Sequence, residues 1–176
     1  ITQLTGITPE ALAAEGIEKA EAAASFCRLL EREDTLLVAY NAQFDLNFLY
    51  YLLRDTGRAS CLKELKFLDA LTVYKDRRDY PHKLKDAIAA YGLDGEVENS
   101  HRAVDDARAM TALLWAMAAE RDDLLEYVNL FGYHPKYGVS GKRISSVTYL
   151  PQSYRRGAPL YEKKLGGDAA AWSGRA

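Results

Sequence analysis

The chain has 176 residues, 48% of them hydrophobic, and a formal net charge of −2 at pH 7. This is enough for one substantial hydrophobic core, and we expect one domain over residues 1–131 followed by an extension over residues 132–176. No apolar run approaches the roughly 18 residues of a membrane-spanning helix, and no leader pattern is readable. Cys27 and Cys61 are isolated in the sequence, which predicts two free thiols, no zinc site and a cytoplasmic location.

The first elements predicted along the chain are two helices. Thr8-Pro9-Glu10 is typical of a helix start with proline at the first position, and Gly16 ends that helix. Residues 18–32 predict a longer, alanine-rich helix. One face of this helix carries Ala20, Ala23, Cys27 and Leu30.

A short apolar run over residues 35–40 predicts an interior strand, and a helix follows it. Phe44, Phe48 and Leu52, with Leu49 beside them, lie at helical spacing. Asp45 comes just after the carboxyl end of the strand, where open α/β sheets bind ligands. Taken alone, Asp45 is either a site carboxylate or a first-turn charge that interacts with the helix dipole.

A second strand is predicted near residues 65–70, where Asp69 follows the apolar pair Phe67-Leu68. Asp69 either orients local backbone or takes a direct part in a site. After it we expect a polar connection over residues 75–81 and a helix over residues 83–91.

The stretch Asn99-Ser-His-Arg-Ala-Val-Asp-Asp-Ala107 places His101 five residues before Asp106, at the start of a helix that runs to about Glu120. The helix dipole favours an ionised Asp106, which suits a hard metal, and a histidine of ordinary pKa, about 6.5, accepts a proton from water near neutral pH. Capping or surface solvation is the alternative for both. Asp105 is about 100° around the helix, so we expect it to be solvated. The expected core-facing residues are Ala103, Ala107, Met110 and Leu114.

Residues 122–130 predict one further short helix, and the composition changes from Gly132 onward. Residues 133–164 contain seven Lys or Arg against one Glu, among several tyrosines. Ile144, Val147 and Tyr149 predict a short strand or hairpin. Basic and aromatic side chains can bind phosphates and stack on unpaired bases; the alternative is a tail that packs by its aromatic residues or binds a protein. Candidate nucleic-acid contacts are Arg102, Lys136, Tyr137, Lys142, Arg143, Arg155 and Arg156.

Two of these stretches resemble motifs of a known family. Asn41-Ala-Gln-Phe-Asp45 and His101-Arg-Ala-Val-Asp-Asp106-Ala are similar to the second and third motifs of the DEDD-type 3′-to-5′ exonucleases with a catalytic histidine, which include the epsilon proofreading subunit of DNA polymerase III and ribonuclease T. Weaker matches follow in the family's order at Gly6-Ile-Thr, Phe67-Leu-Asp-Ala-Leu71 and His82-Lys-Leu84. The resemblance covers about residues 4–119.

The resemblance implies a ribonuclease-H-like α/β fold and two divalent cations, Mg²⁺ or Mn²⁺, that act on the single-stranded 3′ end of DNA or RNA. It also implies a link to DNA replication or repair and a DNA polymerase subunit as a partner. Carried over by position, Asp45 and Asp106 are metal ligands and His101 is the general base. Asn41, Phe44 and Asp69 are secondary site candidates.

The family's first motif, an Asp-x-Glu on the first strand, has no counterpart here. Asp94-Gly-Glu96 has that spacing but lies in a glycine-punctuated loop. Two carboxylates are few for two hard cations, so we expect this chain alone to be inactive or weak. We expect an N-terminally incomplete fold whose sheet edge is covered by missing strands, another chain or a dimer. The alternative is a noncatalytic nucleic-acid- or polymerase-binding module on the same scaffold.

Overall fold

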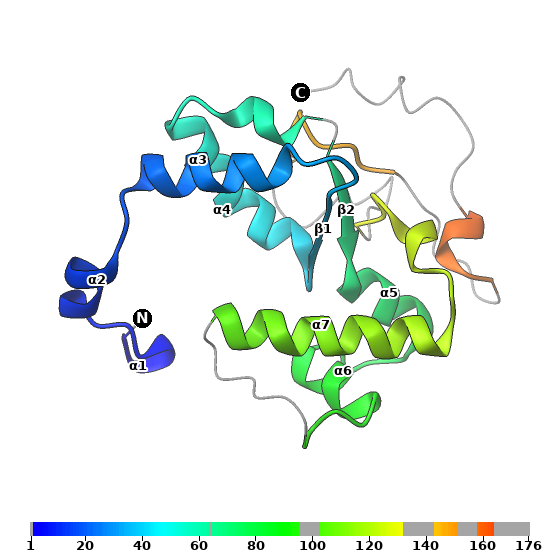
Figure 1. Cartoon of the computed structure of the whole chain (residues 1–176). Coiled ribbons are helices and arrows are strands. Elements are labelled where there is room, and N and C mark those ends of the chain that lie inside the picture. The colour runs from blue at the N-terminus through cyan, green and yellow to red at the C-terminus, as the bar shows by residue number, and fades with distance from the viewer. Residues whose placement is uncertain (1, 64, 96–102, 132–142, 151–157, 164–176) are drawn as a thin grey trace.

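The protein is built around a small parallel sheet with helices on both faces (Figure 1). Its structure is a computed structural model that describes residues 2–63, 65–95, 103–131, 143–150 and 158–163. The sheet pairs β1 (Leu36–Ala39) with β2 (Lys66–Asp69), in the register Leu36 to Lys66 and Ala39 to Asp69. The two predicted strands and the mixed helix and strand class are therefore confirmed.

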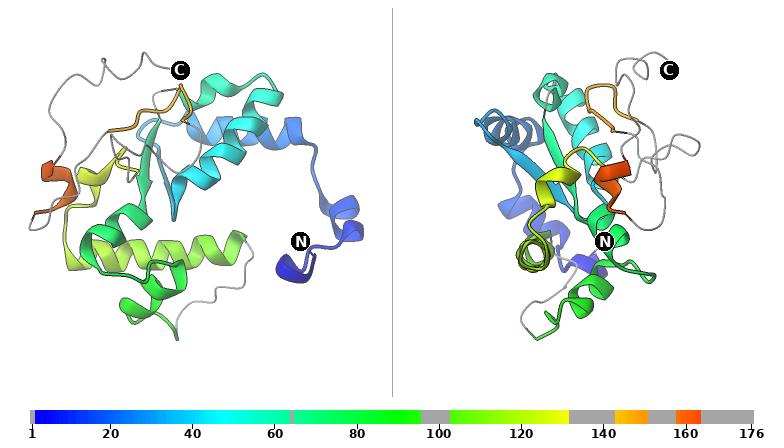
Figure 2. Two further views of the ribbon diagram at one scale, coloured as in Figure 1. Left: turned by 180° about the vertical axis from the view of Figure 1, so that it is seen from behind. Right: turned by 90° about the vertical axis from the view of Figure 1, so that its right-hand side faces the viewer.

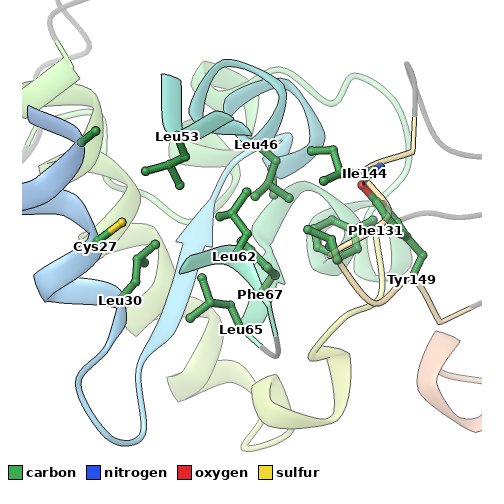
Figure 3. Packing of buried hydrophobic residues seen from close by; sticks show 13 residues of the cluster. Cys27, Leu30, Leu46, Leu53, Leu62, Leu65, Phe67, Phe131, Ile144 and Tyr149 are labelled. Atoms are coloured by element: carbon green, nitrogen blue, oxygen red, sulfur yellow. Dashed lines mark hydrogen bonds between the residues drawn. The ribbon is translucent and has the colours of Figure 1, made fainter. Parts of the chain in front are cut away.

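Alternate side chains of the strands enter two separate clusters of the core. Leu37, Ala39 and Phe67 pack toward α3 (Lys19–Leu30) and α4 (Ala42–Asp55). Figure 3 shows this cluster, in which Leu46 and Leu62 lie beside Phe67. The short 3₁₀ helix η1 (Ala59–Leu62) joins α4 to β2.

The opposite face of the sheet carries Leu36, Val38 and Leu68. These side chains pack against α5 (Ala70–Arg77), α6 (Leu84–Ala90) and α7 (Ala103–Glu120). The two clusters explain why β1 is a continuous apolar run and why β2 carries the apolar pair Phe67-Leu68, since a strand covered on both faces buries successive side chains.

The two long edges of the sheet differ. Beside β2, the backbone N–H of Asn129 donates to Phe67 O at 2.8 Å, and Phe67 N–H donates to Asn129 Oδ1 at 3.1 Å. Among the described residues, no strand pairs with the other edge of β1. This edge is the one that the sequence predicts to need a cover, because an unpaired strand leaves backbone groups without partners.

The N-terminal helices α1 (Thr2–Thr5) and α2 (Pro9–Glu15) stand apart from the sheet in Figure 1 and in the left-hand view of Figure 2. Thr8 caps α2, as its Oγ1 accepts the backbone N–H of Ala11 at 3.1 Å, and Pro9 occupies the first turn. The helix buries none of its residues. The predicted start at Thr8 and end at Gly16 are confirmed.

Three predicted segments differ from the structure. The polar connection expected over residues 75–81 begins inside α5, which starts at Ala70 because Asp69 caps it directly after β2. The helix expected over residues 122–130 is only the 3₁₀ turn η2 (Leu124–Tyr127). Residues 143–150 form no strand or hairpin; they make a turn in which Val147 N–H donates to Ile144 O at 3.0 Å.

Residues 143–150 nevertheless contribute to the core. Ile144, Val147 and Tyr149 are buried in the cluster of Leu46 and Phe67 (Figure 3). The Tyr149 hydroxyl donates to Gln43 Oε1 at 2.8 Å. Farther along, Leu160 of η3 (Leu160–Lys163) is buried in the second cluster.

Apolar residues at helical spacing do not all face the core, and the core-facing stripe predicted on the helix after His101 is partly wrong. On α4, Leu49 and Leu52 pack against the core, but Phe44 and Phe48 are 60% and 66% exposed. Leu46 and Leu53 form an equally regular apolar stripe, and that stripe faces the sheet. On α7, Met110 is buried and Leu114 half-buried, whereas Ala103 and Ala107 are exposed. Leu113 and Met117 take the core-facing positions instead.

The expectation of two free thiols is also wrong. A disulfide joins Cys27 of α3 to Cys61 of η1, with Cα atoms 5.7 Å apart across 34 residues of sequence. The fold brings the two residues together because α3 and η1 pack beside α4. The cysteines therefore give no support to the predicted location. Of the helices that the structure describes, none has the length and apolarity to cross a membrane.

Candidate active site

The first predicted ligand, Asp45, is positioned by the turn between β1 and α4. Asn41 adopts the left-handed conformation, with φ 69° and ψ 52°, and reverses the chain at the end of the strand. Asparagine tolerates this region better than other residues with a side chain. The helix then starts at Ala42, and Asp45 lies in its first turn, as predicted.

Asp69 is the last residue of the neighbouring strand β2, where it pairs with Ala39, and it is 6% exposed. Its Oδ1 accepts the backbone N–H groups of Asn41 at 2.8 Å, Ala42 at 3.2 Å and Leu71 at 3.2 Å. Its Oδ2 accepts the Thr72 hydroxyl at 2.8 Å. These contacts match the first of the two roles considered for Asp69, the orientation of local backbone.

The second predicted ligand, Asp106, lies in the first turn of α7. Its Oδ1 is buried and has no hydrogen-bond partner among the described residues. A buried carboxylate oxygen without a donor is costly, so it is either compensated by a bound group or retained for function. Its neighbour Asp105 forms a 3.4 Å ion pair with Arg108, but its side chain is only 25% exposed, so it is half-buried and not solvated as expected.

Asp45 and Asp106 line one open groove of about 530 Å³. The groove follows β1, which contributes Leu37, Val38 and Ala39, while β2 contributes only Phe67. It therefore lies along the unpaired edge of β1. The remaining lining side chains are mostly apolar: Phe26, Tyr40, Ala42, Phe44, Leu46, Leu49, Leu84, Ala103, Ala107 and Met110.

Burial shapes the electrostatics of this groove. Partial loss of hydration raises the pKa of Asp45 above its ordinary value, and the negative charge of Asp69 adds to that rise. Desolvation also raises the pKa of Asp69, although its hydrogen bonds oppose the change. Desolvation likewise raises the pKa of Tyr40, whose hydroxyl donates to the backbone oxygen of His82 at 2.9 Å.

The fold brings together several predicted residues and leaves others untested. Asp45, Asp106 and Phe44 line the groove, and Asn41 and Asp69 form the turn behind it. His101 lies outside the described residues, and so does Glu96 of the loop Asp-x-Glu. Also outside them are Arg102, Lys136, Tyr137, Lys142, Arg155 and Arg156. Arg143 lies 5.4 Å from the ring centre of Tyr149 and does not line the groove.

The residues around the groove fit a divalent cation in part. Asp106 offers an unpartnered oxygen, and Asp45 offers a second carboxylate from the facing helix. Within the described part of the chain, no group of three or more His, Cys, Asp or Glu side chains gathers to complete a metal site. Hard cations take six or more oxygen ligands, so two carboxylates leave most positions to water, substrate or another segment.

Sequence reasoning missed most of the groove itself. Phe26 comes from α3, and nothing in its local sequence indicates a site. Leu84 belongs to the weak family match His82-Lys-Leu84, but that match assigned it no place in a site. Ala103 and Ala107 did carry a signal, because both belong to the apolar stripe predicted on the motif helix. The stripe faces the groove rather than a filled core.

Comparisons with known proteins agree with the motif resemblance. A family model described as an exonuclease, RNase_T, matches residues 1–114. The chain is 41% identical to the PolC-type DNA polymerase III of Clostridium perfringens over 83 residues, and this matched region is 46% of the chain. It is 33% identical over 95 residues, or 53% of this chain, to the 3′-5′ exonuclease DinG of Staphylococcus aureus. The match spans 5% of the length of the first relative and 10% of the second.

Proposed function

Since the chain belongs to the RNase_T exonuclease family, we propose that it is a metal-dependent 3′-to-5′ exonuclease domain whose active site is the groove along β1. The observation that carries this proposal is the buried, unpartnered Oδ1 of Asp106 in the same groove as Asp45. The two ligand positions inferred from separate motifs thus meet at one place, beside an edge that has room for a substrate or a further strand.

In this proposal Asp45 and Asp106 hold divalent cations, Mg²⁺ or Mn²⁺. Two bound cations supply activation of the attacking water and stabilisation of the leaving 3′-oxygen during in-line displacement. A ring nitrogen of His101 accepts the proton of the water, and the terminal nucleotide leaves as the phosphodiester bond breaks. The apolar wall of the groove excludes bulk water and strengthens the interaction between carboxylates and cations.

The site requires further carboxylates, and the open edge of β1 is the position from which they can come. We propose that an extended segment pairs with this edge and brings acidic side chains beside Asp45 and Asp106. Among the described residues, no strand pairs with this edge of β1, so a further strand could form hydrogen bonds with its backbone groups. The same strand would cover the apolar side chains of the groove. The segment belongs to the same polypeptide or to another chain.

We also propose that the substrate is a single-stranded 3′ end, DNA or RNA, and that the domain works in DNA replication or repair beside a polymerase. The PolC-type relative supports the polymerase link, because its name is that of a DNA polymerase III. Basic side chains of the C-terminal part, among them Arg143, are proposed contacts for the phosphate backbone.

A noncatalytic binding module on the same scaffold is the second candidate. It is favoured by one observation, that the described residues place only two carboxylates in the groove. Such a module would retain affinity for a 3′ end or for a polymerase but would release no nucleotide.

The test is digestion of a 3′-end-labelled single-stranded oligonucleotide with Mg²⁺ or Mn²⁺. The 176-residue chain is compared with the longest polypeptide that its gene encodes. We expect slow or undetectable release by the first and processive release by the second, with loss of activity in Asp45→Asn and Asp106→Asn. His101→Ala is expected to lower turnover while Mn²⁺ binding is largely kept. Asp105→Asn is the matched control and is expected to retain activity.

Two outcomes would contradict the proposal. If Asp106→Asn still releases nucleotides, the groove is not the site of hydrolysis. Binding of the oligonucleotide without release by the extended chain, measured by fluorescence anisotropy, would favour the noncatalytic module.

A further inference from the structure

One buried carboxylate, that of Asp69, reaches the beginnings of two helices. Asp69 is the N-cap residue of α5, where it accepts Leu71 N–H and the Thr72 hydroxyl. It also accepts the N–H groups of Asn41 and Ala42, at the beginning of α4. The N-cap residue of α4, Asn41, makes no capping hydrogen bond with its own side chain. The cap of α4 is therefore supplied by the neighbouring strand.

The parallel register makes this arrangement possible. Ala39 pairs with Asp69, so both strands end at the same level of the sheet. Parallel strands followed directly by helices bring two helix N-termini to one edge, where unpaired N–H groups gather. An anionic side chain between them satisfies several of these groups at once.

The contact also controls a strained turn. Asn41 has φ 69°, and both its own N–H and that of Ala42 point to Asp69 Oδ1. Asp45 follows in the first turn of the same helix, three residues after Ala42. Any change in the path of Asn41 and Ala42 moves the start of α4 and with it the carboxylate of Asp45.

We propose that Asp69 is a positioning residue, which places the Asp45 carboxylate in the groove by capping α4 from the neighbouring strand. The consequence for metal binding rests on the proposed function, but the capping role does not. Asp69 does not line the groove, so its action passes through the turn and not through contact with a cation.

The test uses three substitutions that separate the two capping duties. Asp69→Asn keeps Oδ1 as an acceptor and places an amide near the Thr72 hydroxyl. Asp69→Ser keeps a good cap for α5 but has a side chain too short to reach Asn41. Asp69→Ala removes both caps. Thr8→Ala is the control, because it removes a cap of α2, none of whose residues lines the groove.

Two NMR readouts are made on each variant of the full chain. Hydrogen exchange reports the protection of the Asn41, Ala42 and Leu71 amides, and paramagnetic broadening by added Mn²⁺ reports cation binding near the first turn of α4. In Asp69→Ser we expect exchange at Asn41 and Ala42 to rise about tenfold or more, with Leu71 little changed. The Mn²⁺ midpoint should rise by about threefold or more. In Asp69→Asn both readouts should stay within about twofold of the original chain, as a preserved acceptor implies.

Unchanged exchange at Asn41 and Ala42 in folded Asp69→Ser would overturn the inference. An unchanged Mn²⁺ midpoint with raised exchange would also overturn it, because the cap would then not position Asp45. If the original chain shows no broadening by Mn²⁺, the proposed metal site fails, while the exchange data still decide whether Asp69 caps α4. Thr8→Ala should leave both readouts near the groove unchanged.

Discussion

At the scale of single residues, three residues around the groove are in locally unfavourable states. Asn41 occupies the left-handed region, Asp69 is a buried charge, and Asp106 keeps an oxygen without a partner among the described residues. Each of these features is unfavourable in isolation. Their presence around one groove is typical of a functional site, where geometry is maintained at some expense of stability.

The left-handed turn at Asn41 gives the first prediction. Asn41→Ala should lower the free energy of unfolding by about 1 kcal/mol, because a Cβ without a polar side chain is disfavoured at φ 69°. Asn41→Gly should lie closer to the original chain, since glycine enters this region without a steric penalty. Urea denaturation followed by circular dichroism measures both. Equal losses in the two variants would mean that the side chain, not the backbone conformation, stabilises the turn.

The buried carboxylate of Asp69 predicts a particular pH dependence of stability. Its pKa in the folded protein is raised by desolvation, so its contribution to stability is complete below the unfolded pKa of about 3.9 and is lost as the pH rises through the folded value. Asp69→Asn does not titrate and keeps the Oδ1 acceptor. Relative to the original chain, its free energy of unfolding should therefore increase with pH from about 4 upward and then level off. Urea denaturation across this range would contradict the assignment if the relative stability fell with rising pH.

At the scale of elements, short segments are held in place by contacts from distant parts of the chain. The four-residue strands gain order from helices on both faces, and α3 is joined to η1 by the disulfide between Cys27 and Cys61. The helix α5 begins where β2 ends and has three buried residues in its first four. It was missed by the sequence analysis because its start is decided by the cap at Asp69 more than by a long apolar period.

The disulfide predicts a redox-dependent stability. Under oxidising conditions, Cys61→Ser should lower the free energy of unfolding by about 3 to 4 kcal/mol, the loop-entropy effect for a separation of 34 residues. Adding dithiothreitol should bring the original chain close to the variant and leave the variant unchanged. Guanidinium denaturation with and without reductant measures this. If reductant has no effect on the original chain, the bond makes no contribution in solution.

At the scale of the whole molecule, the two edges of the sheet are treated differently. Asn129 meets the edge of β2, and the segment that carries Ile144 and Tyr149 packs into the same cluster as Phe67. The edge of β1 borders the groove. Within the described part of the chain, Asn129 covers one edge of the sheet, no strand pairs with the other, and the candidate ligands lie at the unpaired edge.

The packing of residues 143–150 predicts that the C-terminal part supports the core. Tyr149→Ala should lower the free energy of unfolding by about 3 to 5 kcal/mol, because it empties a large buried site. Tyr149→Phe should cost about 1 to 2 kcal/mol, since it removes the hydrogen bond to Gln43. The exposed neighbour Thr148→Ala should stay within about 0.5 kcal/mol of the original chain. Equal stability of all three variants in thermal unfolding would mean that this segment does not pack as described.

Local sequence was sufficient for those features that depend on near neighbours. The strands, the helix from Pro9 and the helix α3 follow from apolar periodicity, capping residues and turn chemistry over a few positions. The choice of Asp45 and Asp106 as candidate ligands follows from the resemblance to the exonuclease motifs. The exonuclease family follows from motif order and is confirmed by the match over residues 1–114.

Tertiary structure alone decided which faces are buried and which residues meet. Phe44 and Leu46 are equally apolar, yet only the second faces the sheet, because the turn at Asn41 determines the direction of α4. The pairing of Cys27 with Cys61 and the cap that Asp69 gives to α4 join residues at least 27 positions apart. Local patterns describe how a segment folds, whereas contacts between distant residues depend on how separate segments pack. The sequence by itself therefore predicted the candidate ligands Asp45 and Asp106, and only the tertiary structure showed the groove that both of them line.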